Sequence, residues 1–114
     1  MLAVNRFKTE DAEAFHEGAA PALRAFAACA GYVRGGYGRA VDDPGVWLMW
    51  TEWETVGDYR RSLSSYDVKM CTPFLASALP EPVGFEDLMV IEGGSESGRA
   101  SDHSPEVSGR SDRP

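Results

Sequence analysis

The chain has 114 residues, 43% of them hydrophobic and 25% charged, as expected of a single globular domain. Its 18 acidic and 11 basic residues give a net charge of −7, which argues against binding to nucleic acid or to anionic membrane surfaces. No apolar run approaches the roughly 18 residues of a membrane span. Arg6 and Lys8 interrupt the first apolar stretch too early for a signal peptide, so we expect a cytoplasmic protein.

Two cysteines, Cys29 and Cys71, stand apart, with no CxxC motif and no histidine at ligand spacing. In a reducing compartment this pattern favours buried free thiols over a disulfide. The chain also has too few suitable ligands for a zinc site, and we expect no metal.

The composition changes sharply after Ile91. Residues 93–114 contain no aromatic residue, and Ala100 and Val107 are their only apolar side chains. Such a segment cannot bury enough surface to offset the entropy of ordering it. We therefore predict one folded domain over residues 1–92 and a disordered polar tail over residues 93–114.

The first part of the domain reads as a strand followed by a helix. Residues 2–7 have strand character, and Thr9 resembles a helix N-cap with acidic residues after it. The helix should run to about Cys29, and Pro21 within it predicts a kink or a helix in two parts. Gly31 ends it. The predicted buried stripe comprises Phe15, Ala19, Leu23 or Ala22, Phe26 and Ala30.

The middle of the chain reads as a β-hairpin. Residues 31–41 form the predicted second strand, where Gly35 and Gly36 indicate a bulge or a close backbone approach. The turn sequence DDPG at 42–45 leads directly into VWLMWTEW at 46–53. The short turn between two strand-like runs predicts that they pair with each other.

A second helical region and a last strand follow. Thr55 with Asp58 resembles a capping box, and Thr72-Pro73 resembles the start of a further helical turn. Residues 83–91 are the predicted last strand. The apolar stripe of the helix after Thr55 comprises Val56, Tyr59, Leu63 and Tyr66, which we expect to face the sheet.

This order of elements predicts an α+β fold of the ferredoxin-like βαββαβ type, with a four-stranded antiparallel sheet and both helices on one face. The strand at 46–53 is apolar on both faces, and strand parity does not say which face meets the helices. The two sets are Trp47, Met49, Thr51 and Trp53, and Val46, Leu48, Trp50 and Glu52.

The uncovered face of such a sheet would expose several hundred Å² of apolar surface, as much as the largest patch on a typical monomer. Its burial at about 25 cal/mol per Å² is worth on the order of 10 kcal/mol before association costs. We therefore predict a homodimer through the sheet face. The alternative is that the three tryptophans fill the core of a monomer.

Two stretches, LAVNRF at 2–7 and GYVRGGYGRAVDDPGVWLMWTEWET at 31–55, resemble the antibiotic biosynthesis monooxygenase family. The resemblance extends over about residues 2–91. It implies a dimeric α+β barrel with a substrate cleft between helices and sheet in each subunit. Well-studied members oxygenate polycyclic phenols or quinols without metal or flavin, and others bind and degrade haem.

The resemblance therefore implies a cofactor-independent monooxygenase that oxidises a small aromatic, polyketide-like or quinol substrate with O2. An electron-rich phenolate can pass an electron to O2 itself, so the protein has to bind it, favour its ionised form and exclude water. The alternatives are a haem-binding or haem-degrading member of the same fold and a non-catalytic ligand-binding dimer.

Asn5 is the sharpest site candidate. It lies in the middle of a predicted strand, where asparagine is a poor strand former and a buried amide needs a hydrogen-bond partner. In the resemblance, haem-degrading members carry an asparagine at this position together with a tryptophan and a histidine further on. Those two positions fall near Ser62 and Pro73 here, which cannot serve in their place.

We expect Asn5, Tyr59 and His16 to be the catalytic residues, with His16 as a base lining the cleft or a residue on the solvent side of its helix. On the second strand lie Tyr32, Arg34, Tyr37 and Arg39, and a bulge there would change which of them point inward. Arg34 could hold a phenolate or pair with a surface acid. The predicted substrate-binding residues are Trp50, Trp53, Arg34, Tyr32, Tyr66 and Phe74, and for the aromatic ones core packing is the alternative.

Overall fold

A computed structural model describes residues 1–98 of the chain. Its elements in chain order are β1 Leu2–Lys8, α1 Ala12–Ala27, β2 Tyr32–Arg39, β3 Val46–Trp53, α2 Val56–Ser62, α3 Tyr66–Met70, α4 Thr72–Leu75, β4 Gly84–Phe85, β5 Met89–Glu92 and β6 Ser95–Gly98.

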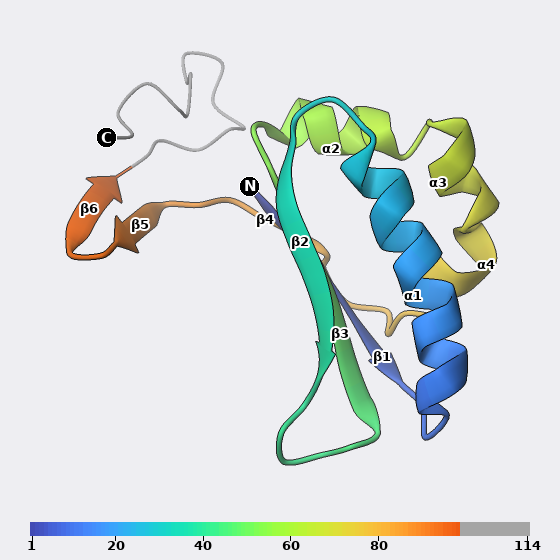
Figure 1. Cartoon of the computed structure of the whole chain (residues 1–114). Coiled ribbons are helices and arrows are strands. Elements are labelled where there is room, and N and C mark those ends of the chain that lie inside the picture. The colour runs from blue at the N-terminus through green and yellow to red at the C-terminus, as the bar shows by residue number, and fades with distance from the viewer. Residues whose placement is uncertain (99–114) are drawn as a thin grey trace.

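The main sheet has four strands in the order β2-β3-β1-β4, and each neighbouring pair is antiparallel. All four helices lie on one side of this sheet (Figure 1). The predicted ferredoxin-like α+β architecture is therefore confirmed. The main core lies between the sheet and α1, where alternate residues of the strands meet one face of the helix.

The β2–β3 hairpin forms as predicted. Its turn is held by the carbonyl and carboxylate of Asp43, which accept hydrogen bonds from the backbone N–H groups of Val46 (3.0 Å) and Gly45 (3.1 Å). The bulge was predicted at Gly35-Gly36, but the register shifts between Tyr32 and Arg34 instead.

The close backbone approach predicted from the two glycines is found at Gly35. A Cβ at Gly35 would lie 2.6 Å from the carbonyl oxygen of Trp50 and 2.8 Å from the phenol oxygen of Tyr32. A side chain does not fit there, because both neighbours leave room only for a hydrogen.

Helix α1 begins two residues later than the predicted cap. The Asp11 carboxylate accepts a hydrogen bond from the N–H of Ala14 (2.9 Å), while the Thr9 hydroxyl accepts one from the N–H of Asp11 (3.1 Å). Asp11 has the extended backbone of an N-cap, so Thr9 belongs to the turn before the helix. The helix is a single element that includes Pro21 on its exposed side, and the two-part alternative is not observed.

The second helical region begins as predicted, because the Thr55 hydroxyl accepts a hydrogen bond from the N–H of Asp58 (3.0 Å). It stops early, at Ser62, and α3 starts afresh with Ser65 as its cap. The predicted continuous stripe is therefore wrong at its end. Tyr66 is 73% exposed and Leu63 is also exposed, since helical spacing does not carry across the break.

The predicted last strand is interrupted. Only Gly84 and Phe85 pair with β1, opposite Ala3 and Leu2. Phe85 lies opposite Leu2, the first residue of β1, so the residues after Phe85 have no part of β1 beside them. Met89–Glu92 instead pairs with Ser95–Gly98 in a hairpin that projects from the body (Figure 1). Residues 95–98, predicted to be tail, thus form β6, and the rest of the predicted tail, 99–114, lies outside the described residues.

Candidate functional site

Strand β3 separates its side chains into a covered and an outer set. Trp47, Met49, Thr51 and Trp53 are buried under the helices, whereas the alternate residues Val46, Leu48, Trp50 and Glu52 face the other side and are half-buried. The structure thereby decides the question that strand parity left open. Trp50, predicted to bind substrate, lies on the outer face, away from the space between helices and sheet.

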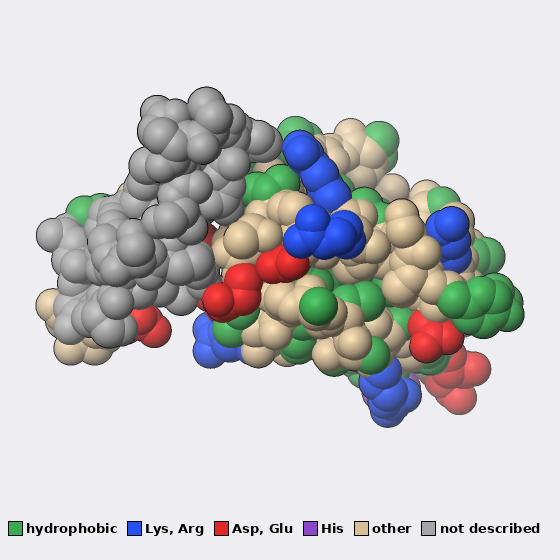
Figure 2. Space-filling model, turned by 90° about the horizontal axis from the view of Figure 1, so that it is seen from above, with side chains coloured by type: hydrophobic (Ala, Val, Ile, Leu, Met, Phe, Trp, Pro, Cys, Tyr) green, Lys and Arg blue, Asp and Glu red, His purple; other side chains and the backbone are tan. Residues whose placement is uncertain are grey.

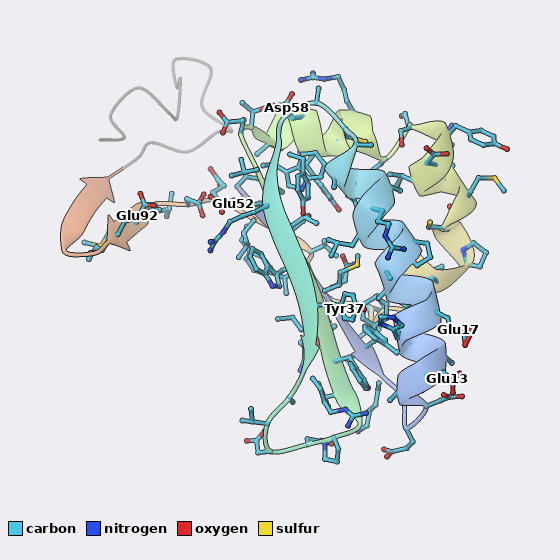
Figure 3. The ribbon with its side chains drawn as sticks, viewed as in Figure 1. Glu13, Glu17, Tyr37, Glu52, Asp58 and Glu92 are labelled. Carbon is cyan, nitrogen blue, oxygen red and sulfur yellow. The ribbon has the colours of Figure 1, made fainter. Side chains whose placement is uncertain are left out.

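On that outer face Trp50 meets Arg34, another predicted binding residue. The Arg34 guanidinium carbon lies 5.3 Å from the centre of the Trp50 ring, within the range of a cation–π contact. The guanidinium also pairs with Glu52 at 3.3 Å. Figure 3 shows Glu52 on the side of the sheet opposite the helices. Arg34 and Trp50 therefore belong to one surface, separate from the covered side of the sheet.

At one end of the covered side, Trp53 is the centre of a closed aromatic cluster. It is 0% exposed, and its indole N–H donates to the Thr51 hydroxyl at 2.7 Å. Its ring centre lies 5.5 Å from that of Tyr32 and 5.9 Å from those of Tyr59 and Phe26, all in edge-on geometry. Burial raises the pKa values of the Tyr32 and Tyr59 phenols, since ionisation would place a charge where little water reaches.

Tyr59 also borders a surface hollow of about 270 Å³ at this end of the sheet. Val56 and Arg60 of α2 and Phe85 of β4 line the same hollow. The end of the molecule seen in Figure 2 carries acidic and basic side chains close together, with no broad basic patch. The hollow is bordered by the half-buried phenol of Tyr59 and by two side chains of opposite charge, Arg60 and Glu86.

A second aromatic cluster at the opposite end of the covered side opens to the surface. Phe15 of α1 is its centre, with ring-centre distances of 4.6 Å to Trp47, 5.1 Å to Phe7 and 5.4 Å to Phe74. Phe74 also stacks on Phe7 at 4.7 Å. Above these rings lies a hollow of about 300 Å³, lined by Phe7, Lys8, Thr9, Ala14, Phe15, Phe74 and Ser77.

Tyr37 was missed as a site residue by the sequence reasoning. Its phenol forms a hydrogen bond with Nδ1 of His16, and its ring meets Phe15 edge-on at 5.8 Å. Figure 3 shows Tyr37 directed from β2 toward α1, whereas Glu13 and Glu17 point away from the sheet. The position of the bulge before Arg34 puts Tyr37 on the covered face, and that could not be read from the sequence.

A cation lies over the same end of the sheet. The Arg39 guanidinium carbon is 4.2 Å from the centre of the Trp47 ring, and the Trp47 indole N–H donates to the carbonyl oxygen of Thr9 at 3.1 Å. This end of the covered side therefore combines an aromatic surface, a tyrosine–histidine pair and a positive charge.

Asn5 lies opposite Met49 in the sheet and is half-buried. It has the same strand parity as Ala3 and Phe7, so its side chain is on the covered face. Within residues 1–98, no hydrogen bond is assigned to its amide group. Phe7 is the next residue on that face, so Asn5 lies roughly 7 Å from the open cluster.

The three predicted catalytic residues do not meet in one place. His16 bonds to Tyr37, which pairs with Met49, whereas Tyr59 contacts Trp53 four residues further along β3. Four strand residues correspond to roughly 13 Å. His16 and Asn5 border the open end, and Tyr59 belongs to the closed end.

Two kinds of feature are absent from the described residues, 1–98. No three histidine, cysteine, aspartate or glutamate side chains gather there in an arrangement that could hold a metal ion. None of the helices in this part of the chain is both long and apolar enough to span a membrane. Cys29 and Cys71 are both free thiols.

Comparison with known proteins gave matches by structure only. No family model and no curated protein matches the sequence. SnoaB, a cofactor-independent oxygenase from Streptomyces nogalater, matches with a TM-score of 0.61 and 25% identity, over 73% of this chain and 86% of that one. A Deinococcus radiodurans protein assigned to the antibiotic biosynthesis monooxygenases matches with a TM-score of 0.61 and 15% identity, over 81% and 97%. The fold of this chain is therefore that of the antibiotic biosynthesis monooxygenases, whose solved members it matches over about three quarters of its length.

Proposed function

We propose that the chain is a small cofactor-independent monooxygenase that oxidises an aromatic polyketide-like or quinol substrate with O2. The observation that carries the proposal is the open cluster, where Phe7, Phe15 and Phe74 line a surface hollow and Asn5 lies two residues before Phe7 on the same strand face. An apolar hollow with a few polar groups is the usual form of a small-molecule site. The structural match to a cofactor-independent oxygenase supports the same reaction class.

The reaction needs no external reductant when the substrate supplies the electrons. For an anthrone, the CH₂ group and O2 give a carbonyl group and water, so one oxygen atom enters the product and the other leaves as water. The first step is loss of a phenolic or benzylic proton, because the resulting anion can donate an electron to O2. The protein therefore has to orient the substrate, take up this proton and exclude bulk water.

The residues at the open end match these tasks. Phe7 and Phe15 offer apolar ring surfaces to an aromatic substrate, and the Asn5 amide can donate a hydrogen bond to an oxygen of the substrate. The Tyr37 phenol and Nδ1 of His16 share a hydrogen bond, so the pair can take up the substrate proton and pass a proton between oxygen and nitrogen. Tyr59, at the closed end, takes no part in this scheme.

Oxygen uptake with a panel of anthrones and hydroquinones tests the reaction. We expect Asn5→Leu to lower kcat/KM by about 10²-fold, comparable to the loss of one preorganised hydrogen-bond donor. His16→Gln should alter the pH profile, and Glu17→Gln, on the outer side of α1, is the matched control. Folded protein that consumes no oxygen with any compound of the panel would refute the proposal. A shifted Soret band on titration with haem would favour the haem-binding alternative.

We further propose that the protein acts as a homodimer through the outer face of the sheet. Leu2, Val4, Leu48 and Trp50 form an apolar surface there with no helix over it. The projecting β5–β6 hairpin adds exposed apolar side chains, with Leu88 and Met89 each 61% exposed and Ile91 57% exposed. The hairpin projects on the side of the sheet opposite the helices (Figure 1). A second copy would cover both surfaces, and proteins of this family are commonly dimeric.

Sedimentation at micromolar concentration tests this assembly. A stable dimer is expected for the full chain, and a single subunit across that range would contradict it. Replacing Leu48 with glutamate should yield monomers that keep the far-ultraviolet circular dichroism spectrum of the native fold, because Leu48 does not contribute to the core under the helices.

A further inference from the structure

Phe74 occupies an unusual position in the open cluster. Its ring is stacked on Phe7, with 4.7 Å between ring centres and 21° between ring planes, and it is edge-on to Phe15 at 5.4 Å. These are the contacts that an aromatic ligand would make if it lay between β1 and α1. The ring is also at the surface, since Phe74 is half-buried and lines the hollow of about 300 Å³.

The opposite wall of this space is Gly18 of α1. A Cβ on Gly18 would lie 2.4 Å from Cδ1 of Phe74, so the ring rests directly against the helix backbone. Glycine within a helix is unfavourable compared with alanine. Gly18 thus leaves room for one flat ring between α1 and Phe7, and any added side chain would fill it.

The element that carries Phe74 is short, and its hydrogen bonds are local: the Thr72 hydroxyl donates to the carbonyl oxygen of Lys69 and the Ser77 hydroxyl to that of Phe74, both at 2.6 Å. Helix α4 has four residues, Thr72–Leu75, and no side-chain hydrogen bond caps its N-terminus. These bonds hold the backbone of the turn and not the Phe74 ring, so the ring stays in place through its contacts with Phe7, Phe15 and Gly18. An incoming ring that makes the same contacts can therefore take the place of Phe74.

We propose that the space between Phe7, Phe15 and Gly18 is a slot for one planar aromatic ring of a ligand, and that Phe74 fills it in the free protein. The slot deepens the proposed function, on which it rests, by naming Phe74 as the residue that the aromatic substrate displaces. Lys8 lies at the mouth of the hollow, where its ammonium group favours an anionic substituent such as a phenolate.

The slot should bind flat aromatic rings in preference to thicker saturated rings. Stacked aromatic rings lie close together, whereas a saturated ring is thicker and cannot make the stacked contact. The test ligands are 2-naphthol and its saturated counterpart, decahydro-2-naphthol, which have the same carbon skeleton and the same hydroxyl group. Phe74→Ala should bind 2-naphthol at least 10-fold more tightly than the parent protein does, because no side chain has to move. Binding of decahydro-2-naphthol should increase much less.

Two further variants keep the test decisive. Leu75→Ala truncates the adjacent residue of the same turn and should leave 2-naphthol binding unchanged. Gly18→Ala, introduced into the Phe74→Ala variant, favours the helix but narrows the slot, and should cancel the gain. Equal gains for Leu75→Ala and Phe74→Ala, equal gains for both ligands, or a gain that survives Gly18→Ala would each overturn the slot.

Binding is measured by calorimetry without O2, so its outcome is separate from that of the oxygenase proposal. If Phe74→Ala shows the expected gain in affinity but no anthrone supports oxygen uptake, the slot is supported and the oxygenase proposal is refuted. If oxygen is consumed but Phe74→Ala shows no gain in affinity, the slot is refuted and the oxygenase proposal is supported.

Discussion

The two aromatic clusters under the helices have the same types of residue but different surroundings. Around Trp53, every neighbouring ring is edge-on, and the indole is fully buried with its N–H bonded to Thr51. In the open cluster around Phe15, two pairs of rings are stacked instead, Trp47 on Phe15 and Phe74 on Phe7, and Phe74 comes from a four-residue helix at the surface. Aromatic content alone therefore does not distinguish core from site. The difference lies in whether each ring is held by long elements on every side.

The largest expected effect is at the closed cluster. Trp53→Ala should lower the free energy of unfolding by about 3–5 kcal/mol, since it removes a fully buried indole and leaves a cavity. Urea denaturation followed by circular dichroism measures the change. A loss below about 1 kcal/mol would mean that the closed cluster is not the core of the domain.

Trp50 lies on the outer face of β3, so its replacement should affect dimer formation, whereas replacement of Trp53 on the covered face affects the stability of the domain. We expect Trp50→Ala to raise the dimer dissociation constant roughly 100-fold, as for an aromatic residue at the centre of an interface. The apparent stability of the parent dimer should depend on protein concentration, and that of the variant should do so less. Val41→Ala, at a fully exposed site in the β2–β3 turn, is the control, and sedimentation gives the dissociation constants.

Replacing a phenylalanine by alanine in each cluster, Phe74 in the open one and Phe26 in the closed one, compares how much each cluster contributes to stability. Phe74→Ala should cost about 1–2 kcal/mol of unfolding free energy, because the ring is only half-buried. Phe26→Ala, in the closed cluster, should cost about 3–5 kcal/mol. Equal losses in thermal or urea unfolding would show that the open cluster is as much a part of the core as the closed one.

The smallest effect is expected for the half-buried phenol of Tyr59. Burial raises its pKa in the folded state, so the folded protein keeps this proton at a pH where the unfolded chain has lost it. Stability should therefore be unaffected by Tyr59 below pH of about 10 and decline above it. Tyr59→Phe should show a shallower decline in urea midpoint between about pH 9 and 11. Parallel declines in the two proteins would contradict this assignment.

The fold was largely predictable because its signals are local. DDPG specifies the β2–β3 turn, Thr55 caps α2, and the alternation of element types leaves few topologies. Errors arose where a local pattern was extended past a break. Tyr66 was assigned to the stripe of α2, but α2 ends at Ser62, and the last strand was drawn through residues that have no part of β1 beside them.

The candidate site was predicted only in part. Asn5 was singled out as a polar group on an apolar strand, and the structure puts it on the covered face beside the open cluster. Arg34 and Trp50 were grouped with it, but they lie on the outer face. Tyr37 could not be recognised, because its orientation depends on a one-residue register shift several positions earlier in β2.

The sequence by itself determined the order of the elements, the hairpin, and the fact that β3 is apolar on both faces. Those properties depend on residue periodicity and turn chemistry, which act over a few neighbours. Only the tertiary structure decided which face of β3 the helices cover, and that Phe7, Phe15 and Phe74 meet beneath a surface hollow while Tyr59 lies at the far end. These outcomes depend on register and on packing between segments distant in the chain, and neither is encoded in any short stretch of residues.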